Sequence, residues 1–356
     1  MLEKEELARY SRQMILPEFG IAGQEALKNA RVLMIGAGGL GCPALQYLVA
    51  AGVGMIGIVD DDEVSLSNLH RQILYSAADL GKKKAFVAKE RLQALNPFVK
   101  IVTFTDRLTS QNAASLLADF DLIIDGSDNF GTRYLVNDTC VAISKPLVFG
   151  SIYKFEGQVS VFNYRGGPNY RDIYPVPPAE NEVPNCSEIG VLPVLPGIIG
   201  LYMANEAIKV ICDIGENLSG KLMLLDALGN SVNIFKIGKG AYQQPKEEEK
   251  HVIPSRAEEK HTGNEISLSE LEQWLEADPQ GICLVDVREA YEFEEFNIGG
   301  INISLYELTE KTGLIPDDKT LVLCCETGQR SRMAVKILEK QFPGKLYNIK
   351  NGIRSR

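Results

Sequence analysis

The feature that most constrains this chain is a glycine-rich turn between an apolar strand and a helix. Residues 32–35 read Val-Leu-Met-Ile, and the sequence continues as Gly36-Ala37-Gly38-Gly39-Leu40-Gly41. Glycines at such a turn let backbone N–H groups and a helix N-terminus approach an anionic phosphate. A second apolar strand ends at Asp60, where a carboxylate can hydrogen-bond a ribose hydroxyl. The pattern predicts a nucleotide-binding βαβ unit.

Polar and cationic residues further along the chain distinguish this site from a plain dinucleotide-binding fold. Asn68, Arg71 and Lys84 supply an amide and two positive charges near the expected phosphates, as phosphoryl or nucleotidyl transfer requires. Asp128 follows another apolar strand, so we expect it at the same carboxyl edge of the sheet, where a carboxylate can hold Mg²⁺. Arg71 or Lys84 alone could be a solvated surface charge. Their occurrence together after a glycine loop favours a site for phosphate chemistry.

The composition argues against several classes of protein. A net charge of −10 disfavours broad nucleic-acid binding, which needs an electropositive surface. No run of about 18 apolar residues is apparent, so we expect no membrane-spanning segment. The acidic N-terminus lacks the apolar region of a secretory signal. Seven cysteines without the spacing of a disulfide framework indicate a reduced, cytoplasmic protein.

The succession of apolar and polar segments predicts two α/β domains joined by a tether. Residues 1–240 are expected to form a Rossmann-like, mostly parallel sheet, and residues 264–356 a small α/β domain. Residues 241–263 carry many charges and almost no apolar side chains, which predicts a flexible linker. The expected strands are 31–35, 55–59, 100–104, 121–125, 146–150, 158–162, 282–286 and 320–324, and the expected helices include 197–212, 269–276 and 330–340.

Further motifs run through the first domain in a definite order. They are Arg9-Tyr10-Ser11-Arg12-Gln13, the glycine loop, Ser67-Asn68-Leu69-His70-Arg71-Gln72, Asn96-Pro97, Ser127-Asp128-Asn129-Phe130, Phe155-Glu156-Gly157-Gln158 and Gly190-Val191-Leu192. This ordered series resembles the MoeB/ThiF branch of the ubiquitin-activating-enzyme superfamily over residues 5–238.

The resemblance implies a homodimeric enzyme that uses ATP to adenylate the C-terminal Gly-Gly carboxylate of a ubiquitin-like sulfur-carrier protein of the MoaD or ThiS type. Such carriers serve molybdopterin, thiamine and cysteine biosynthesis and tRNA thiolation, and the sequence leaves the pathway open. Arg12 would reach into the ATP site of the neighbouring subunit. The implied ATP-site residues are Gly36, Gly38, Gly39 and Gly41 in the loop, Asp60 on the ribose, Asn68, Arg71 and Lys84 on the triphosphate, and Asp128 on Mg²⁺.

Two features depart from the pattern of relatives or leave a role open. Many relatives hold a structural zinc ion with two C-x-x-C pairs, but here the place of the first pair reads Pro168-Asn169-Tyr170-Arg171-Asp172. The region just after Ile237 also lacks cysteine, so we expect no zinc. Cys186 lies where some relatives carry a cysteine that links covalently to the carrier. The alternative for Cys186 is a small apolar residue in a turn.

A second candidate site lies near the C-terminus. An apolar strand ending at Cys324 runs into Cys325-Glu326-Thr327-Gly328-Gln329-Arg330-Ser331 and then a helix. Backbone N–H groups, a helix N-terminus and the charge of Arg330 would favour the anions of a Cys325 thiol and persulfide, whereas Cys324 is expected to be buried and inert. This loop, with the upstream segment 284–289 (Leu-Val-Asp-Val-Arg-Glu), resembles the rhodanese active-site region over residues 266–353. Residues 296–300 depart from the usual Gly-His-Ile-Pro-Gly segment.

The two domains together predict an adenylyltransferase with a sulfurtransferase domain. A carrier would be adenylated and would then receive sulfur from a Cys325 persulfide, loaded by a donor such as a cysteine desulfurase, to give a thiocarboxylate. Two alternatives remain open: a non-catalytic rhodanese-like binding module, and an NAD-dependent oxidoreductase. The oxidoreductase lacks an acid–base candidate, because His70 sits in the phosphate-binding run. Whether the small domain acts on its own subunit or across the dimer is also open.

Overall fold

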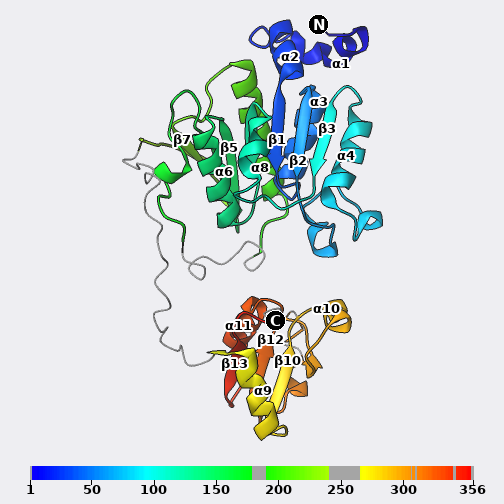
Figure 1. The fold of residues 1–356 in the computed structure, drawn as a ribbon, viewed down its shortest axis with the longest axis vertical. Coiled ribbons are helices and arrows are strands. Elements are labelled where there is room, and N and C mark those ends of the chain that lie inside the picture. Colours follow the sequence, from blue (N-terminus) through cyan, green and yellow to red (C-terminus); the bar gives the residue numbers. More distant parts are fainter. Residues whose placement is uncertain are drawn as a thin grey trace. The chain divides into compact units, whose positions relative to one another are not determined.

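The chain forms two compact units, Met1–Pro245 and Lys246–Arg356, each built on its own sheet (Figure 1). The structure, a computed structural model, describes residues 2–178, 190–239, 265–305, 307–308, 311–339 and 342–353. The whole of the predicted linker, 241–263, and Cys186 therefore lie outside the described residues.

The first unit contains an eight-stranded sheet in the order β3-β2-β1-β4-β5-β6-β7-β8. Strands β1 to β5 run parallel, and β6 to β8 continue the sheet antiparallel. The predicted mostly parallel α/β fold is confirmed. The strands are β1 Arg31–Ile35, β2 Met55–Val59, β3 Lys100–Phe104, β4 Leu122–Asp125, β5 Leu147–Tyr153, β6 Glu156–Phe162, β7 Lys221–Asp226 and β8 Ser231–Lys236.

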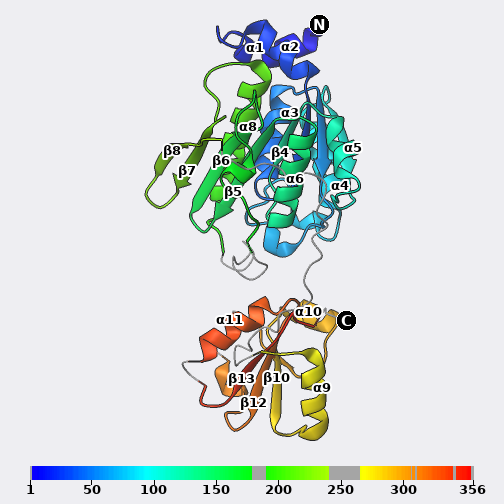
Figure 2. The same ribbon diagram turned by 60° about the vertical axis from the view of Figure 1, so that its left-hand side comes forward.

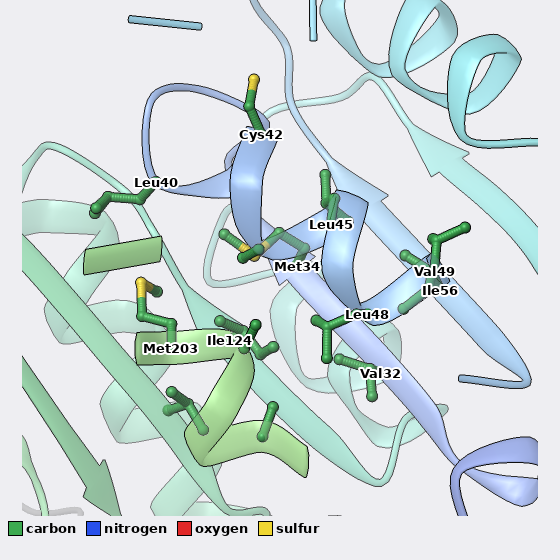
Figure 3. Packing of buried hydrophobic residues seen from close by; sticks show 14 of the residues in the cluster. Val32, Met34, Leu40, Cys42, Leu45, Leu48, Val49, Ile56, Ile124 and Met203 are labelled. Atoms are coloured by element: carbon green, nitrogen blue, oxygen red, sulfur yellow. The ribbon is translucent and has the colours of Figure 1, made fainter. Parts of the chain in front are cut away.

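Helices cover both faces of this sheet (Figure 2). Along β1 successive side chains point to opposite faces: Val32 and Met34 pack with α3 (Figure 3), whereas Leu33 and Ile35 pack with α5 and α6. The helices are α1 Lys4–Met14, α2 Gly20–Asn29, α3 Gly41–Ala51, α4 Lys84–Leu95, α5 Ala113–Ala118, α6 Phe130–Ala142 and α8 Leu195–Cys212, with 3₁₀ turns η1 Leu66–Asn68, η2 Ala77–Asp79 and η3 Tyr170–Asp172.

The strand order determines where a ligand can bind. From β1 the chain moves outward through β2 and β3, and then returns to β4 on the other side of β1. Connections on the two sides of β1 diverge at this point and leave a crevice at the carboxyl ends of the strands. The glycine loop follows β1, Asp60 follows β2, and Asp128 follows β4, so the three predicted segments reach the same edge.

The glycine loop permits an unusually close contact between strand and helix. Gly36 adopts a left-handed conformation with φ of 86°, which glycine tolerates and other residues rarely adopt. A Cβ atom on Gly41 would lie 2.0 Å from the carbonyl oxygen of Gly36. The first turn of α3 can therefore sit against the end of β1 only if residue 41 has no side chain.

Helix α8 is long and apolar enough to span a membrane by length and composition alone, which departs from the expectation that no such stretch exists. Half of this stretch is buried inside the protein, where Leu195, Ile199 and Met203 join the core beneath α3. Core helices of soluble proteins satisfy the same criterion, so the finding is weak support for a membrane segment. Its packing against the sheet identifies α8 as a core helix.

The second unit contains a five-stranded parallel sheet in the order β11-β10-β12-β13-β9. Cys324 and Cys325 face opposite layers of its core, as expected for neighbouring residues at a strand end. The predicted central strands and the two predicted helices are present. The elements are β9 Glu265–Ile266, α9 Leu268–Ala277, β10 Ile282–Asp286, α10 Ala290–Glu295, β11 Ile301–Asn302, η4 Thr312–Leu314, β12 Thr320–Cys324, α11 Gln329–Leu338 and β13 Leu346–Ile349.

Side-chain hydrogen bonds hold the loop at 168–172, where relatives place the first zinc-binding pair. Asn169 and Asp172 form a capping box around η3. The backbone N–H of Tyr170 donates to Oδ1 of buried Asn137 at 2.8 Å. The polar residues that replace the two thiols thus satisfy the backbone of the turn themselves.

An ion pair and an aromatic cluster reinforce the same loop. Arg171 donates twice to the carboxylate of Asp138, with both distances 2.7 Å. The ring of Tyr170 packs against four other aromatic rings, those of Tyr134, Phe149, Phe162 and Tyr174. These contacts supply a physical means of fixing the loop without a metal, and the absence of zinc stays a prediction.

Replacing Asn137 by alanine should lower the free energy of unfolding by about 1–3 kcal/mol, because the buried N–H of Tyr170 loses its acceptor. Dialysis of the wild-type chain against a chelator should leave its Tm unchanged. Calorimetry measures both effects, and Asn233→Ala on exposed β8 is the control. A lower Tm after chelation, with zinc in the dialysate, would show that a structural zinc is present.

Candidate active sites

A cleft of about 340 Å³ opens at the edge where β1, β2 and β4 end. It brings together most of the residues that the sequence predicts for an ATP site, although they span almost a hundred positions of the chain. The predicted residues that line it are Gly36, Gly38, Gly39, Asp60, Arg71, Lys84 and Asp128.

Three predicted site residues do not line the cleft. Gly41 acts through the close packing of α3 on Gly36. Asn68 lies in η1, where its carbonyl oxygen accepts the backbone N–H of Arg71 at 3.1 Å, so it shapes the turn that carries Arg71. Arg12 is exposed on α1. Within one chain, the expected arginine finger thus lies away from the cleft.

Asp60 ties the glycine loop to the second strand. Its Oδ2 accepts the N–H of Ala37 at 2.7 Å, and its Oδ1 accepts the N–H of Asp62 at 3.0 Å. Burial raises the pKa of Asp60, and the nearby charge of Lys84 opposes this shift. Each carboxylate oxygen has a second lone pair, so Asp60 can organise the loop and still accept a ribose hydroxyl.

Lys84 carries a positive charge whose present partner, a carboxylate, a phosphate could replace. Its Nζ lies 2.8 Å from Oδ2 of Asp62; the Lys84 side chain is 5% exposed and that of Asp62 is 69% exposed. An exposed carboxylate loses little by returning to water. A phosphate can therefore replace Asp62 at the ammonium group without leaving a buried charge unpaired.

Arg71 is held by its own turn. One guanidinium nitrogen, Nη1, donates to the carbonyl oxygen of Ser67 at 3.0 Å and lies 2.6 Å from Nε2 of His70. Burial lowers the pKa of His70, and the charge of Arg71 lowers it further. The imidazole is thus a neutral acceptor for Arg71 at neutral pH, which leaves the guanidinium as the positive group of the pair.

The cleft also contains cationic residues that sequence reasoning missed. Arg107 and Arg133 both line it. Arg133 is buried, lies over the rings of Phe130 and Phe149 at 5.3 and 5.8 Å, and donates to the carbonyl oxygen of Ser127 at 3.1 Å. Helical spacing could have revealed Arg133, which lies one turn beyond Asn129, the N-cap of α6. Arg107 follows β3, so the rule that strands end at one edge could have indicated it.

Gln72 is a further residue that the sequence analysis did not assign. It lines the cleft beside Arg71, and a Cβ on Gly38 would lie 3.5 Å from its Nε2. Its Oε1 is buried and lacks a hydrogen-bond partner within the described part of the chain. Buried polar atoms of folded proteins nearly always have partners, so this orphan acceptor supports a ligand that brings a donor.

Asp128 is the candidate for the predicted Mg²⁺. It is exposed at the cleft, whereas the neighbouring Asp125 is buried and its Oδ1 accepts the N–H of Ser127 at 2.9 Å. Burial raises the pKa of Asp125. No group of three or more His, Cys, Asp or Glu side chains among the described residues could hold a metal. Mg²⁺ bound to nucleotide phosphates needs only one or two protein carboxylates, so Asp128 fits that role.

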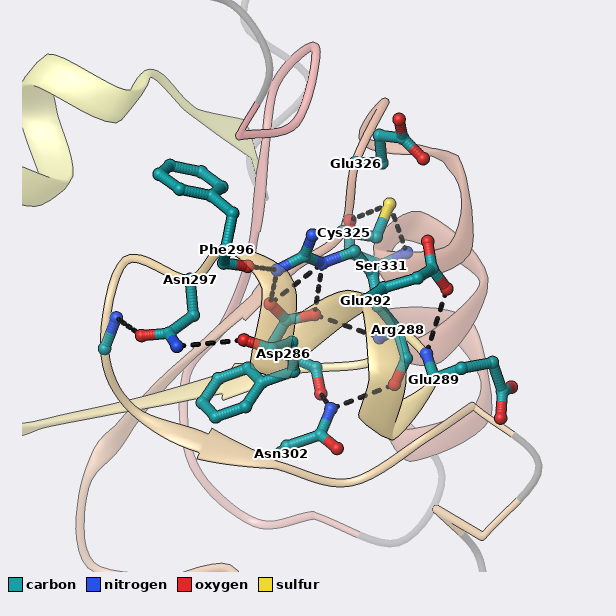
Figure 4. A network of polar contacts seen from close by, with 12 residues as sticks. Asp286, Arg288, Glu289, Glu292, Phe296, Asn297, Asn302, Cys325, Glu326 and Ser331 are labelled. Carbon is teal, nitrogen blue, oxygen red and sulfur yellow. Dashed lines mark hydrogen bonds and ion pairs between the residues drawn. The ribbon is translucent and has the colours of Figure 1, made fainter. Parts of the chain in front are cut away.

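The second site surrounds Cys325 at the junction of β12 and α11 (Figure 4). Its side chain is fully buried. The backbone N–H of Ser331 lies 3.4 Å from Sγ, and Oγ of the same serine lies 3.3 Å from it. The helix N-terminus thus contributes an amide to the sulfur, as the sequence indicated, and Ser331 adds a hydroxyl that the sequence analysis did not assign. Cys324 is buried in the other layer, and burial raises its pKa well above the ordinary value.

Arg330 does not give its full charge to the sulfur. It donates twice to Glu292, at 2.6 and 2.7 Å, and lies 3.8 Å from Glu326. The hydrogen bonds with Glu292 raise the pKa of Arg330. The expectation of a free positive charge beside Cys325 therefore needs correction, because two carboxylates share the guanidinium.

Comparison with known proteins identifies both units. Residues 10–246 match the model of the ThiF family, and residues 267–355 match that of the rhodanese-like domain. The chain belongs to the ThiF family. It carries a rhodanese-like domain after the ThiF region, so both predicted resemblances are confirmed.

Curated relatives of this ThiF family member carry matching names. It is 44% identical to the probable adenylyltransferase/sulfurtransferase MoeZ of Mycobacterium tuberculosis, over 99% of this chain and 93% of the relative. It is 57% identical to the sulfur carrier protein adenylyltransferase of Thermus thermophilus, over 63% of this chain and 85% of that one. It is 40% identical to the adenylyltransferase and sulfurtransferase MOCS3 of Drosophila yakuba, over 96% of this chain and 81% of the relative. The predicted enzyme class, an ATP-using adenylyltransferase with a sulfurtransferase domain, is confirmed.

Solved structures support the fold of the ThiF region. The crystal structure of E. coli MccB with ATP has a TM-score of 0.59 at 22% identity, covering 65% of this chain and 72% of that one. The structure of PaaA has a TM-score of 0.57 at 23% identity, covering 66% and 75%. At these identities the likeness concerns the fold.

Lys84→Met should reduce ATP–pyrophosphate exchange by about 10²–10³-fold, because the cleft loses a preorganised charge. Lys82→Met is a matched control: Lys82 is exposed, pairs with Asp79 at 3.3 Å and does not line the cleft. It should change exchange by less than about twofold. Equal losses in the two variants, with both folded by circular dichroism, would remove the role assigned to Lys84.

Proposed function

We propose that this ThiF family member adenylates the C-terminal Gly-Gly carboxylate of a ubiquitin-like sulfur carrier of the MoaD or ThiS type and then converts it to a thiocarboxylate. The observation that carries the proposal is the convergence of the glycine loop, Asp60, Arg71, Lys84 and Asp128 on one cleft. Support comes from relatives named as sulfur-carrier adenylyltransferase and as adenylyltransferase/sulfurtransferase.

In the first step, an oxygen of the carrier's carboxylate attacks the α-phosphorus of ATP. A new O–P bond forms, the bond to the β-phosphate oxygen breaks, and pyrophosphate leaves. The loop amides and Asp60 would hold the nucleotide, while Arg71 and Lys84 would stabilise the charge that develops on the phosphates. Mg²⁺ held by Asp128 would supply further charge neutralisation when bound.

In the second step, the terminal sulfur of a Cys325 persulfide attacks the acyl carbon. A C–S bond forms, AMP leaves with the electron pair of the C–O bond, and the carrier is joined to Cys325 through an acyl disulfide. A thiol then attacks the sulfur of Cys325, breaks the S–S bond and releases the thiocarboxylate. Cys186 is a candidate for this thiol. The alternative is that Cys186 has no chemical role and serves only as a small apolar residue. An external thiol would reduce the resulting disulfide.

This chemistry needs reducing conditions, and the cysteines of the described residues are consistent with such conditions. Cys42, Cys140, Cys212, Cys283, Cys324 and Cys325 are all free, as is typical of a reducing compartment. We place the protein in the cytoplasm, where a cysteine desulfurase can supply persulfide sulfur.

The NAD-dependent alternative gains no support from a cleft lined by cations and carboxylates. The hydrogen-bond donors at Cys325 favour a working thiol over a non-catalytic binding module.

The purified chain should catalyse ATP–[³²P]pyrophosphate exchange only with a carrier that ends in Gly-Gly. The same carrier without its last two glycines is the matched control, because it keeps the docking surface and loses the reacting group. Arg71→Ala and Asp128→Ala should each lower exchange by about 10²-fold or more. Exchange absent with MoaD-type and ThiS-type carriers alike would count against the proposal.

The proposed homodimer rests on the N-terminal segment. Arg12 is exposed, and it is followed by the exposed apolar side chains of Ile15, Leu16 and Ile21, which are 70%, 54% and 60% exposed. Apolar side chains grouped in this way are typical of a contact surface. A second subunit on this segment would cover them and bring Arg12 to the neighbouring ATP cleft.

Mixing two inactive variants tests this arrangement. In a heterodimer of Arg12→Ala and Asp128→Ala subunits, one cleft has an intact Asp128 and receives an intact Arg12 from the other subunit. Random exchange of subunits in a symmetric dimer should restore about a quarter of wild-type exchange activity. If Arg12 acts only within its own chain, the mixture stays as inactive as its two components.

A further inference from the structure

Gln72 presents a buried hydrogen-bond acceptor to the cleft of the ThiF region. Its side chain is 4% exposed and lines the cleft, and its Oε1 lacks a hydrogen-bond partner among the described residues. Because buried polar atoms of folded proteins nearly always have partners, we expect a ligand group to complete the pair. An amide oxygen can only accept hydrogen bonds, so that ligand group is a donor.

Two other buried polar atoms carry less information about a ligand. Within the described ranges, Oγ of Ser127 and Oδ2 of Asp125 also lack partners. A hydroxyl both donates and accepts, so Ser127 specifies no ligand chemistry, and Asp125 does not line the cleft. Gln72 is therefore the residue whose missing hydrogen bond has both a defined direction and a defined place.

The turn that carries Gln72 packs on the glycine loop. A Cβ atom on Gly38 would lie 3.5 Å from Nε2 of Gln72. Three residues further along the chain, the hydroxyl of Tyr75 donates to the carbonyl oxygen of Ala37 at 2.8 Å. These two contacts place the amide of Gln72 beside the loop that is proposed to hold the phosphates.

ATP brings no suitable donor to this end of the cleft. In the proposed complex its ribose hydroxyls face Asp60, and the adenine amino group lies on the far side of the sugar from the phosphates. The ionised phosphate oxygens are acceptors, as Oε1 of Gln72 is. The second reactant, the carrier, is therefore the source of the donor.

The reacting end of the carrier has one backbone donor in the right place. The carboxylate oxygen that attacks the α-phosphorus belongs to a glycine, and only two carbon atoms separate this oxygen from the N–H of the same residue. A carboxylate held beside the glycine loop therefore brings that N–H close to Gln72. Glycine has no side chain that would keep its backbone away from a buried acceptor.

We propose that Oε1 of Gln72 accepts the backbone N–H of the carrier's last glycine and thereby orients the carboxylate toward the α-phosphorus. The inference rests on the proposed adenylation of a Gly-Gly carrier. A hydrogen bond to the N–H leaves both carboxylate oxygens free, so it orients the nucleophile without neutralising its charge. Gln72 then makes the cleft selective for a terminal peptide group.

Replacing Gln72 by methionine keeps the length of the side chain and removes the acceptor. Gln72→Met should lower kcat/KM for the carrier in ATP–pyrophosphate exchange by about tenfold, the value of one buried hydrogen bond. The Kd for ATP, measured without carrier by calorimetry, should change by less than about twofold. Gln273→Met, at an exposed position of α9, is the control and should match the wild type. Weaker binding of ATP alone would place the donor on the nucleotide and overturn the proposal.

A change in the carrier identifies the donor. The MoaD-type or ThiS-type carrier that supports exchange is prepared by semisynthesis with glycolate in place of its last glycine, so that an ester oxygen replaces the N–H. With the wild-type chain this carrier should also lose about tenfold in kcat/KM. With Gln72→Met the replacement should cost less than about twofold, because the acceptor is already absent. Two losses that multiply to about a hundredfold would overturn the proposal, because the N–H then has another acceptor.

Further outcomes keep the test decisive. Full exchange by the wild-type chain with the glycolate carrier would overturn the proposal even if Gln72→Met did not fold. Gln72→Asn, which draws the acceptor back by one methylene and keeps the amide, repeats the comparison in that case. Absence of exchange with the carrier that ends in Gly-Gly would instead contradict the proposed adenylation, a result that the glycolate replacement cannot produce.

Discussion

The ThiF region depends on the contact between the first turn of α3 and the end of β1. A side chain at residue 41 would overlap the carbonyl oxygen of Gly36, so the helix can approach the sheet only through glycine. This approach directs the N-terminal amides of α3 at the crevice and brings Ala37 within reach of Asp60. The geometry of the proposed phosphate site is thus a consequence of backbone packing, and the charged side chains are arranged around it.

The cations of the cleft are held in advance by partners of different kinds. Lys84 pairs with an exposed carboxylate that can return to water, Arg71 rests on a carbonyl and a neutral imidazole, and Arg133 is stacked on aromatic rings. Each positive group is therefore held in position by contacts within the chain. Preorganised charge of this kind stabilises a transition state without reorganisation during the reaction.

Both units place their chemistry at the same structural junction, where a parallel strand turns into a helix. In the ThiF region the glycine loop leaves the junction open, and we propose that an external anion binds there. In the rhodanese-like domain the junction holds Cys325, a side chain of the protein itself, and the site is closed. There the hydroxyl of Ser331 lies 3.3 Å from the sulfur and 2.6 Å from Oδ1 of Asn348, so hydrogen bonds link the buried site to β13.

The sequence alone determined the local elements and the order of the chemical groups. The run 32–41 predicts a strand, a turn and a helix from covalent geometry, and the loop from Cys325 to Ser331 does the same near the C-terminus. Tertiary structure decided which groups meet. Arg107, Arg133 and Gln72 line the cleft. Gly41 allows close packing of α3, and Arg330 forms an ion pair with Glu292. Asn348 reaches Ser331 because β13 lies beside β12. Such pairings depend on strand order and on side-chain direction in segments that are distant in the sequence. Periodicity along the chain therefore cannot predict them.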